Sequence, residues 1–111
     1  MNLRDLDQRI TFQVVTHSRD AVGGAVESWA DLYQVWAMRR DLKGKEAVEA
    51  LQKVATAEVL FTIRASSQTR LLTAKNRLVH NGQVFEIVAP PVAIPSGRPV
   101  KIELLTRALN G

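Results

Sequence analysis

The sequence predicts a mostly β protein: a small β-barrel, SH3-like or sandwich-like, of five to six strands with one short amphipathic helix. Three observations predict this class. Short segments in which apolar and polar residues alternate recur along the chain. Turn residues separate these segments, and one Asn-Gly pair has the form of a hairpin loop. The 111 residues suffice for one domain, residues 1–111, with a modest core, and barrel closure would remove exposed strand edges.

The N-terminal part of the chain contains two predicted strands joined by a polar segment. Every second residue from Ile10 to Val14 is apolar, so residues 8–15 have the pattern of a half-buried strand. Residues 17–28 are polar and carry a Gly-Gly pair at their centre, so we expect a turn or flexible loop there. Residues 32–39 are rich in aromatic and β-branched side chains and predict the second strand.

One segment, residues 45–55, has helical periodicity. At about 100° per residue, its apolar side chains, which include Val48, Leu51 and Val54, fall on one arc, and its charged and polar side chains fill the rest. A helix this short is marginal alone and must dock to persist.

The hairpin signal lies in the second half of the chain. Residues 58–64 alternate and predict a strand, whereas residues 65–75 are polar and ambiguous. Asn81-Gly82 then joins strands predicted over residues 76–80 and 83–89, because a type I′ turn needs φ > 0 at both central positions.

A two-residue loop fixes the register of this hairpin. It places apolar residues opposite apolar residues and Arg77 opposite Glu86, which supports the pairing. Residues 89–99 contain all four prolines of the chain, and proline cannot donate to a sheet ladder, so we expect an extended loop. Residues 99–106 predict the last strand.

Residue types suited to catalysis or metal binding are sparse. The chain has no cysteine, which excludes disulfides, thiolate metal sites and cysteine nucleophiles. Its two histidines, His17 in the polar segment and His80 beside the hairpin turn, are interpreted as surface residues, because no spacing indicates a triad with a serine. The sequence has no HExxH motif, EF-hand loop or phosphate loop. We therefore expect no enzyme, no catalytic residue, no metal and no cofactor.

The N-terminus and the apolar runs of the chain bear on its location. The N-terminal segment is charged and has no apolar region of a secretory signal. No apolar run approaches the ~20 residues needed to span a bilayer. We expect a cytoplasmic protein with no membrane partner.

The net charge of +4 invites a nucleic-acid hypothesis. Arg39, Arg40, Lys43 and Lys45 form a basic run that could face DNA phosphates, although a solvated face is the more common explanation of such a run. Trp29 and Trp36 could stack bases, but in a chain with so few aromatic residues we interpret them as core or interface anchors.

The order of several short motifs resembles that of the phage head–tail joining family, whose members are also called head-closure, head-completion or stopper proteins. The resemblance covers residues 3–106. Its motifs are Arg9-Ile10-Thr11-Phe12-Gln13, Gly23-Gly24, Trp29, Trp36-Ala37, Gly44-Lys45-Glu46, Phe61-Thr62-Ile63-Arg64, Asn81-Gly82-Gln83-Val84-Phe85-Glu86-Ile87 and Lys101-Ile102-Glu103-Leu104. One departure is Phe85, where a tyrosine often stands in the family.

The resemblance implies a structural role in the virion, at the head–tail interface, for a protein made in the bacterial host cytoplasm. The implied fold is a small β-barrel with a long, helix-containing excursion between two strands, which would correspond to residues 40–56 here. The implied assembly is a homo-oligomeric ring, a hexamer or alternatively a dodecamer, around the DNA channel. Its partners would be the portal or adaptor ring of the head and the tail terminator or tail tube protein. Contact with the packaged double-stranded DNA would be weak and non-specific, because an adhesive surface would hinder ejection.

Candidate contact residues follow from amphipathicity, proline content and charge. For contacts with other subunits or partners we expect Trp29, Val48, Leu51, Val54, Pro90, Pro91, Ile94 and Pro95. For the face toward the DNA channel we expect Arg39, Arg40, Lys43 and Lys45.

Two other function classes stay open. One is a small basic β-barrel that binds nucleic acid, whose affinity would fall steeply with salt. The other is a hydrolase, which would require turnover that depends on His17 or His80.

Overall fold

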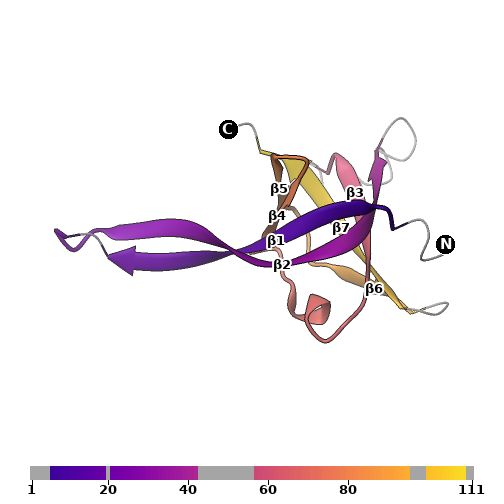
Figure 1. Ribbon diagram of the computed structural model, residues 1–111, viewed down its shortest axis with the longest axis horizontal. Helices are drawn as coiled ribbons and strands as arrows, with labels where there is room; N and C mark the ends of the chain where they lie inside the picture. Colours follow the sequence, from indigo (N-terminus) through magenta and orange to yellow (C-terminus); the bar gives the residue numbers. More distant parts are fainter. Residues whose placement is uncertain (1–5, 20, 43–56, 96–99, 110–111) are drawn as a thin grey trace.

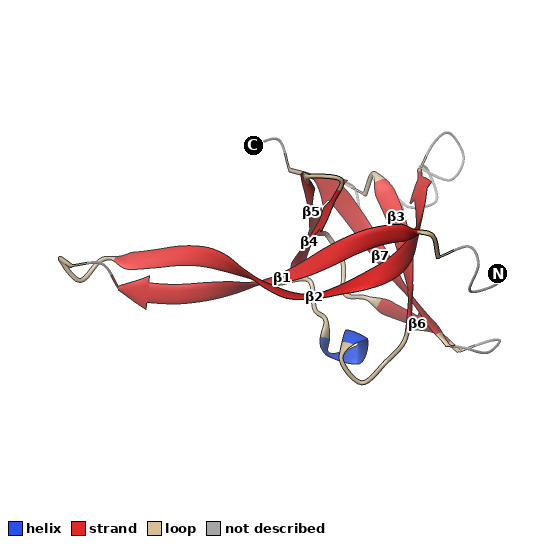
Figure 2. Ribbon diagram, viewed as in Figure 1, coloured by secondary structure: helices blue, strands red, loops and turns tan. Residues whose placement is uncertain are grey.

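The structure is a computed structural model that describes residues 6–19, 21–42, 57–95 and 100–109. Within these residues the chain is almost entirely strand, so the predicted mostly β class is confirmed (Figure 1, Figure 2). There are seven strands, where five to six were expected. They are β1 (Gln8–Arg19), β2 (Ala25–Asp41), β3 (Val59–Arg64), β4 (Arg77–His80), β5 (Gln83–Ile87), β6 (Val92–Ile94) and β7 (Lys101–Ala108), with one 3-10 turn, η2 (Thr69–Leu71).

The strands form one antiparallel sheet in the order β3-β2-β1-β4-β5-β7-β6. β3 also pairs with β7, from Val59 opposite Thr106 to Arg64 opposite Lys101. The hydrogen-bonded circuit of six strands therefore returns on itself, and only β6 lies outside it.

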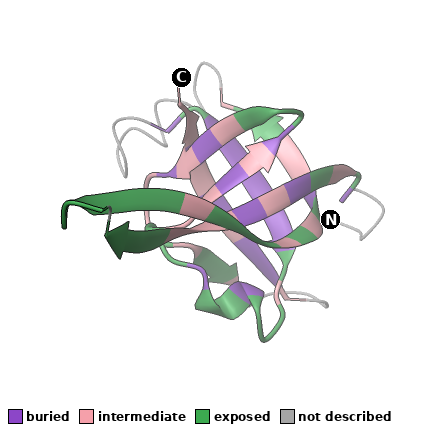
Figure 3. Cartoon of the chain, turned by 60° about the vertical axis from the view of Figure 1, so that its left-hand side comes forward, coloured by how far each residue is buried: buried purple, intermediate pink, exposed green. Residues whose placement is uncertain are grey.

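The core is built from residues of these six strands, together with Leu72 just after η2. Figure 3 shows the buried positions alternating along the strands of the sheet. The alternation predicted around Ile10 and Phe12 is confirmed, because both side chains are fully buried. Apolar alternation on a pleated strand directs every second side chain to the same face, and this face packs here. The core residues are Ile10, Phe12, Ala37, Val59, Phe61, Ile63, Leu72, Leu78, Phe85, Ile87, Ile102 and Leu104.

The β4–β5 hairpin has the predicted loop and register. Asn81 and Gly82 have φ of 52° and 78°, as a type I′ turn requires. Arg77 stands opposite Glu86 in the ladder, as expected. Their side chains nevertheless take other partners, because Glu86 forms its ion pair with Arg107 of β7.

The turn predicted at Gly23-Gly24 is confirmed, but the polar segment on either side of it is strand, which the polar pattern did not predict. The β1–β2 ladder continues to Arg19 opposite Ala25, and only the tip forms a turn, with Gly23 at φ 86°. The hydroxyls of Thr16 and Ser28 hydrogen-bond across it at 2.7 Å. Polar residues suit these positions because the ribbon leaves the core here and both its faces meet solvent.

A β-bulge in β2 decides which face the two tryptophans occupy. The register with β1 shifts between Phe12 and Gln13, and Leu32 is the extra residue on β2. Strict alternation would place Trp29 and Trp36 on opposite faces. The extra residue reverses the alternation beyond it, so both indole rings lie on the same outer face of the ribbon.

The proline-rich segment contains a short strand, which corrects the expectation of an extended loop over residues 89–99. Val92–Ile94 pairs with β7 between Pro91 and Pro95. The three residues between the prolines keep their N–H groups, and β6 is an edge strand, where flanking prolines are tolerated. The helix predicted over residues 45–55 lies outside the described residues.

Two buried threonines offer a matched test of polar burial. Thr62 and Thr106 are both fully buried. The Thr106 hydroxyl donates to the carbonyl of Val59 at 2.9 Å. The Thr62 hydroxyl has no hydrogen-bond partner among the described residues. Thr62→Val should raise the free energy of unfolding by about 1 kcal/mol, because an unsatisfied hydroxyl is removed. Thr106→Val should lower it by about 1 kcal/mol. Urea unfolding of both variants measures the difference, and a loss of stability in Thr62→Val would contradict this interpretation.

Candidate interaction surface

A two-stranded arm projects from the closed sheet. We define the arm as residues 14–19 and 21–30, the ends of β1 and β2 with the turn between them. Among the described strands, β1 pairs with β4 only over Ile10–Gln13, and β2 pairs with β3 only from Ala37 onward. The arm therefore pairs only with itself. It follows the longest axis of a molecule of 51 × 30 × 23 Å, and nearly all its residues are exposed (Figure 1, Figure 3).

Each tryptophan on the outer face lies beneath an arginine. The guanidinium of Arg77 lies 4.0 Å from the Trp29 ring centroid, and that of Arg9 lies 4.8 Å from the Trp36 ring centroid. Arg77 Nε also donates to Gln13 Oε1 at 2.7 Å. Partial burial lowers the pKa of Arg77, but a guanidinium stays charged at neutral pH. The outer face therefore carries two positive groups held on aromatic platforms.

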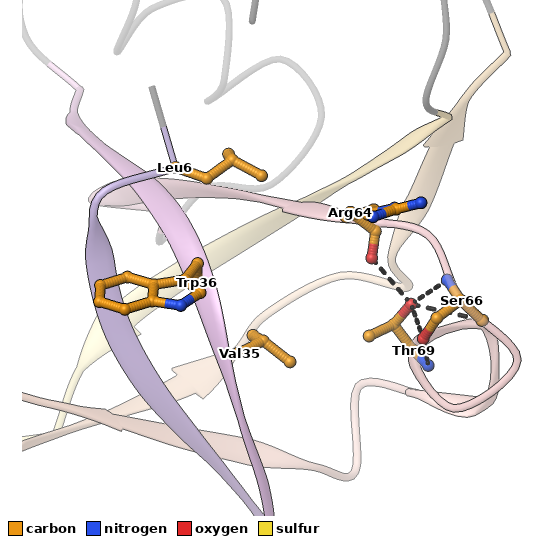
Figure 4. A pocket seen from close by; sticks show the side chains of 6 residues that line it. All are labelled: Leu6, Val35, Trp36, Arg64, Ser66 and Thr69. Carbon is orange, nitrogen blue, oxygen red and sulfur yellow. Dashed lines mark hydrogen bonds between the residues drawn. The ribbon is translucent and has the colours of Figure 1, made fainter. Parts of the chain in front are cut away.

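An open pocket lies beside Trp36, where β2 approaches the turn before η2 (Figure 4). Its volume is about 390 Å³. Leu6 and Val35 make apolar walls, Trp36 is 53% exposed, and Arg64 supplies a positive charge. The lining residues are Leu6, Val35, Trp36, Arg64, Ser66 and Thr69.

Hydrogen bonds fix one wall of this pocket. The Thr69 hydroxyl donates to the carbonyl of Arg64 at 3.0 Å and accepts from the Ser66 N–H at 2.7 Å (Figure 4). The Tyr33 hydroxyl donates to the carbonyl of Gln68 at 3.0 Å and ties this turn to β2. These hydrogen bonds hold the turn that carries Ser66 and Thr69 in place beside β2.

His80 is buried, so its interpretation as a surface residue is wrong. The side chain is 3% exposed and packs edge-on against Phe61. Arg39 Nη1 lies 3.1 Å from His80 Nδ1, and His80 Nε2 lies 2.9 Å from Gln8 Oε1. An arginine can only donate, so Nδ1 accepts and Nε2–H donates to Gln8. Burial, followed by the charge of Arg39, lowers the pKa of His80 below its ordinary 6.5.

Stability should therefore depend on pH through His80. Below about pH 6.5 the imidazole of His80 binds a proton in the unfolded chain but resists one in the folded chain. The free energy of unfolding therefore falls as the pH drops, until the folded-state pKa of His80 is reached. The slope is at most about 1.4 kcal/mol per pH unit. Above about pH 6.5 this contribution is constant. Urea unfolding at about pH 7.5 and about pH 5.5 should show a smaller pH difference for His80→Gln than for the unaltered chain. His17→Gln, on the exposed arm, is the control, and equal pH differences in all three proteins would refute the assignment.

The residues expected to contact partners fall on separate elements. Trp29 is half-buried under Arg77 at the base of the arm. Pro90 and Pro95 are exposed, whereas Pro91 and Ile94 are half-buried around β6, away from the arm (Figure 1). The expected helix residues Val48, Leu51 and Val54 lie outside the described residues.

The basic run does not form a single surface in the part that the structure describes. Arg39 and Arg40 are adjacent on β2, so their side chains point to opposite faces. Arg39 turns toward His80 and also binds Asp41 at 3.1 Å, whereas Arg40 is exposed. Lys43 and Lys45 lie outside the described residues.

Sequence reasoning did not identify the pocket. Its walls come from positions far apart in the chain, and Arg64 stands in the sequence only as one of several scattered cations. Leu6, an apolar residue just ahead of the first strand, was the one local indication of the pocket, and no periodic pattern separates it from other apolar residues.

No group of three or more His, Asp or Glu residues that could hold a metal ion occurs within the described ranges. The same residues include no helix long and apolar enough to cross a bilayer.

The family model and a curated relative both point to one family. The family described as "Phage head completion protein" matches residues 1–107. Head completion protein gp7 of Enterobacteria phage HK97 is 32% identical over 105 residues, which cover 90% of this chain and 91% of gp7. The solution structure of protein SF1141 from Shigella flexneri 2a is similar with a TM-score of 0.75 and 28% identity, covering 97% of this chain and 96% of that chain.

A chain in the virion of a native gene transfer agent particle shares the fold, with a TM-score of 0.53 and 17% identity over 95% of this chain and 96% of that chain. The family match spans nearly the whole sequence, and the identity to gp7 extends over a similar length. The resemblance stated from the motifs is thereby confirmed, and the chain belongs to the phage head completion protein family of viral structural proteins.

Proposed function

We propose that this chain is a connector subunit that forms a ring between the DNA-filled head and the tail and helps to close the DNA channel. The observation that carries the proposal is the family match over residues 1–107. The ring would be a hexamer or alternatively a dodecamer. On its head side it would meet the portal or adaptor ring, and on its tail side the tail terminator or tail tube protein.

The fold supports this proposal in two ways. The six-strand circuit closed by the β3–β7 pairing is consistent with a small β-barrel that serves as a rigid body. The arm projects from this body as an isolated two-stranded ribbon, which is at best marginally stable in water without further packing. A subunit of a ring gains such packing from its neighbours.

In the proposed ring, this chain would contact DNA only weakly, as the DNA passes through the channel. Among the residues proposed for the channel face, Arg40 is exposed, and Lys43 and Lys45 follow it in the sequence. Arg39 fits less well, because its guanidinium lies against His80 and 5.3 Å from the Phe85 ring centroid.

The nucleic-acid-binding alternative is not favoured by the geometry. Base stacking needs a free aromatic face; the guanidinium of Arg77 covers one face of the half-buried Trp29, and that of Arg9 covers one face of Trp36. A binding module would also lose affinity with salt, with a log–log slope of about −0.9 for each phosphate contacted on duplex DNA.

Copy number and position in purified virions test the proposal. Quantitative mass spectrometry should find this chain at the stoichiometry of a single ring per particle, and imaging with a tagged chain should place it at the head–tail junction. A copy number matching the capsid lattice, or a tag distributed over the head, would overturn the proposal.

A further inference from the structure

Strand β2 runs from the tip of the arm to the pocket, and its two relevant positions lie far apart. Trp36 lines the pocket, and Ala25 begins β2 next to the turn at the tip. The stretch of β2 between these two residues spans about 35 Å of extended chain. Because β2 is paired with β1 along this length, the arm cannot fold back, and its tip cannot reach the pocket of its own chain.

The tip carries side chains whose chemistry matches the pocket. Val22 at the turn is 91% exposed. Glu27, close to the turn on β2, presents an exposed carboxylate. The tip therefore offers a small apolar group together with a negative charge.

The pocket offers the complementary set. Leu6, Val35 and the exposed ring of Trp36 provide apolar surface, and Arg64 provides a positive charge. A guanidinium binds a carboxylate well because its donors form a planar fork. Apolar walls with one charged group define the kind of partner that the pocket accepts: a small apolar side chain with an acidic neighbour.

We propose that the arm tip of one copy docks in the pocket of the next copy, with Val22 against the apolar walls and Glu27 facing Arg64. Each copy then donates one tip and receives one. Such a heterologous contact closes into a ring when the rotation between copies allows it. This inference rests on the proposed ring and names the contact that links its subunits.

Disulfide trapping tests the contact, because the chain has no cysteine of its own. A Val22→Cys/Ser66→Cys double variant places one thiol at the tip and one in the pocket. A disulfide forms only when the two Cα atoms lie within about 4.4–6.8 Å. Oxidised virions carrying this variant should give a ladder of linked subunits on a non-reducing gel, whereas either single variant should give no ladder.

A matched control uses another exposed valine. Val92 on β6 is 59% exposed, and Val92→Cys/Ser66→Cys should give no ladder. Charge reversal gives a second measurement: Glu27→Arg or Arg64→Glu alone should weaken the trapping a few-fold, and the two together should restore it. Should the double-cysteine variant fail to enter particles, the same trapping is performed on the concentrated purified protein with the same expectation.

The outcomes separate this inference from the proposed function. Particles that contain the double-cysteine variant and bear tails, but give no ladder, overturn the contact and leave the connector role intact. Linkage of the thiol introduced by Ser66→Cys to a head or tail polypeptide also overturns it, because the pocket then receives a different partner. A ladder from the purified protein, combined with normal tails on particles lacking the chain, supports the contact and overturns the connector role.

Discussion

Phe61→Ala is expected to lower the free energy of unfolding by about 3–5 kcal/mol, the usual cost of truncating a buried phenylalanine. Phe61 is fully buried at the centre of β3, with the rings of Phe85 and His80 edge-on at 5.4 Å and 5.7 Å. Truncation would leave a cavity and remove both ring contacts, which add about 0.5–1.5 kcal/mol each beyond burial. Native proteins have only about 5–15 kcal/mol in total, so this substitution removes a large share of the stability.

Urea unfolding of the purified protein measures this loss. Leu71→Ala is the control, because Leu71 is 79% exposed on η2 and its truncation should change stability by less than about 0.5 kcal/mol. Equal effects from the two substitutions would show that the closed sheet does not enclose the core described here.

Shortening the arm should abolish joining while leaving the fold intact. Thr16 and Ser28 are cross-strand partners, so residues 17–27 can be replaced by Asn-Gly to make a two-residue hairpin. Every described residue that is removed is exposed, so the free energy of unfolding should change by less than about 1 kcal/mol.

The functional cost of this change should be large. Loss of an interface anchor typically costs at least about 2 kcal/mol, or roughly 30-fold in affinity, and a ring loses one such contact at every subunit. Thermal unfolding and the titre of infectious particles are measured together. His17→Gln, which alters the arm without shortening it, should keep the titre. A full titre from the shortened chain would exclude the arm from assembly.

The sequence predicted the local pairing well, because that pairing depends on neighbours in the chain. Asn81-Gly82 determined the turn, and the two-residue loop determined the register of β4 with β5. Apolar alternation likewise identified the buried face around Phe12 and Leu104. The family could be inferred from the order of the motifs along the chain.

Features that depend on distant parts of the chain were not predictable in this way. Arg77 lies opposite Glu86, as expected, but its side chain stacks on Trp29, which the bulge at Leu32 had turned to the outer face. His80 was expected at the surface because it stands beside a turn, yet Phe61 and Arg39 enclose it from other strands.

The arm illustrates the remaining difficulty. A polar segment with paired glycines usually forms a loop, because it lacks an apolar face to bury. Here the same segment continues a ladder that begins in the core, so pairing extends from Ile10 outward to Arg19 without burial. Period-two apolarity detects strands that pack on a core and misses strands that do not.

The central claim is that this chain joins head to tail by contacts alone. Its most direct test is imaging of particles assembled without it. We predict heads that fill with DNA, carry no tails and leak their genome, with recovery when the unaltered chain is supplied. Particles that retain their DNA and bear normal tails in its absence would contradict the claim.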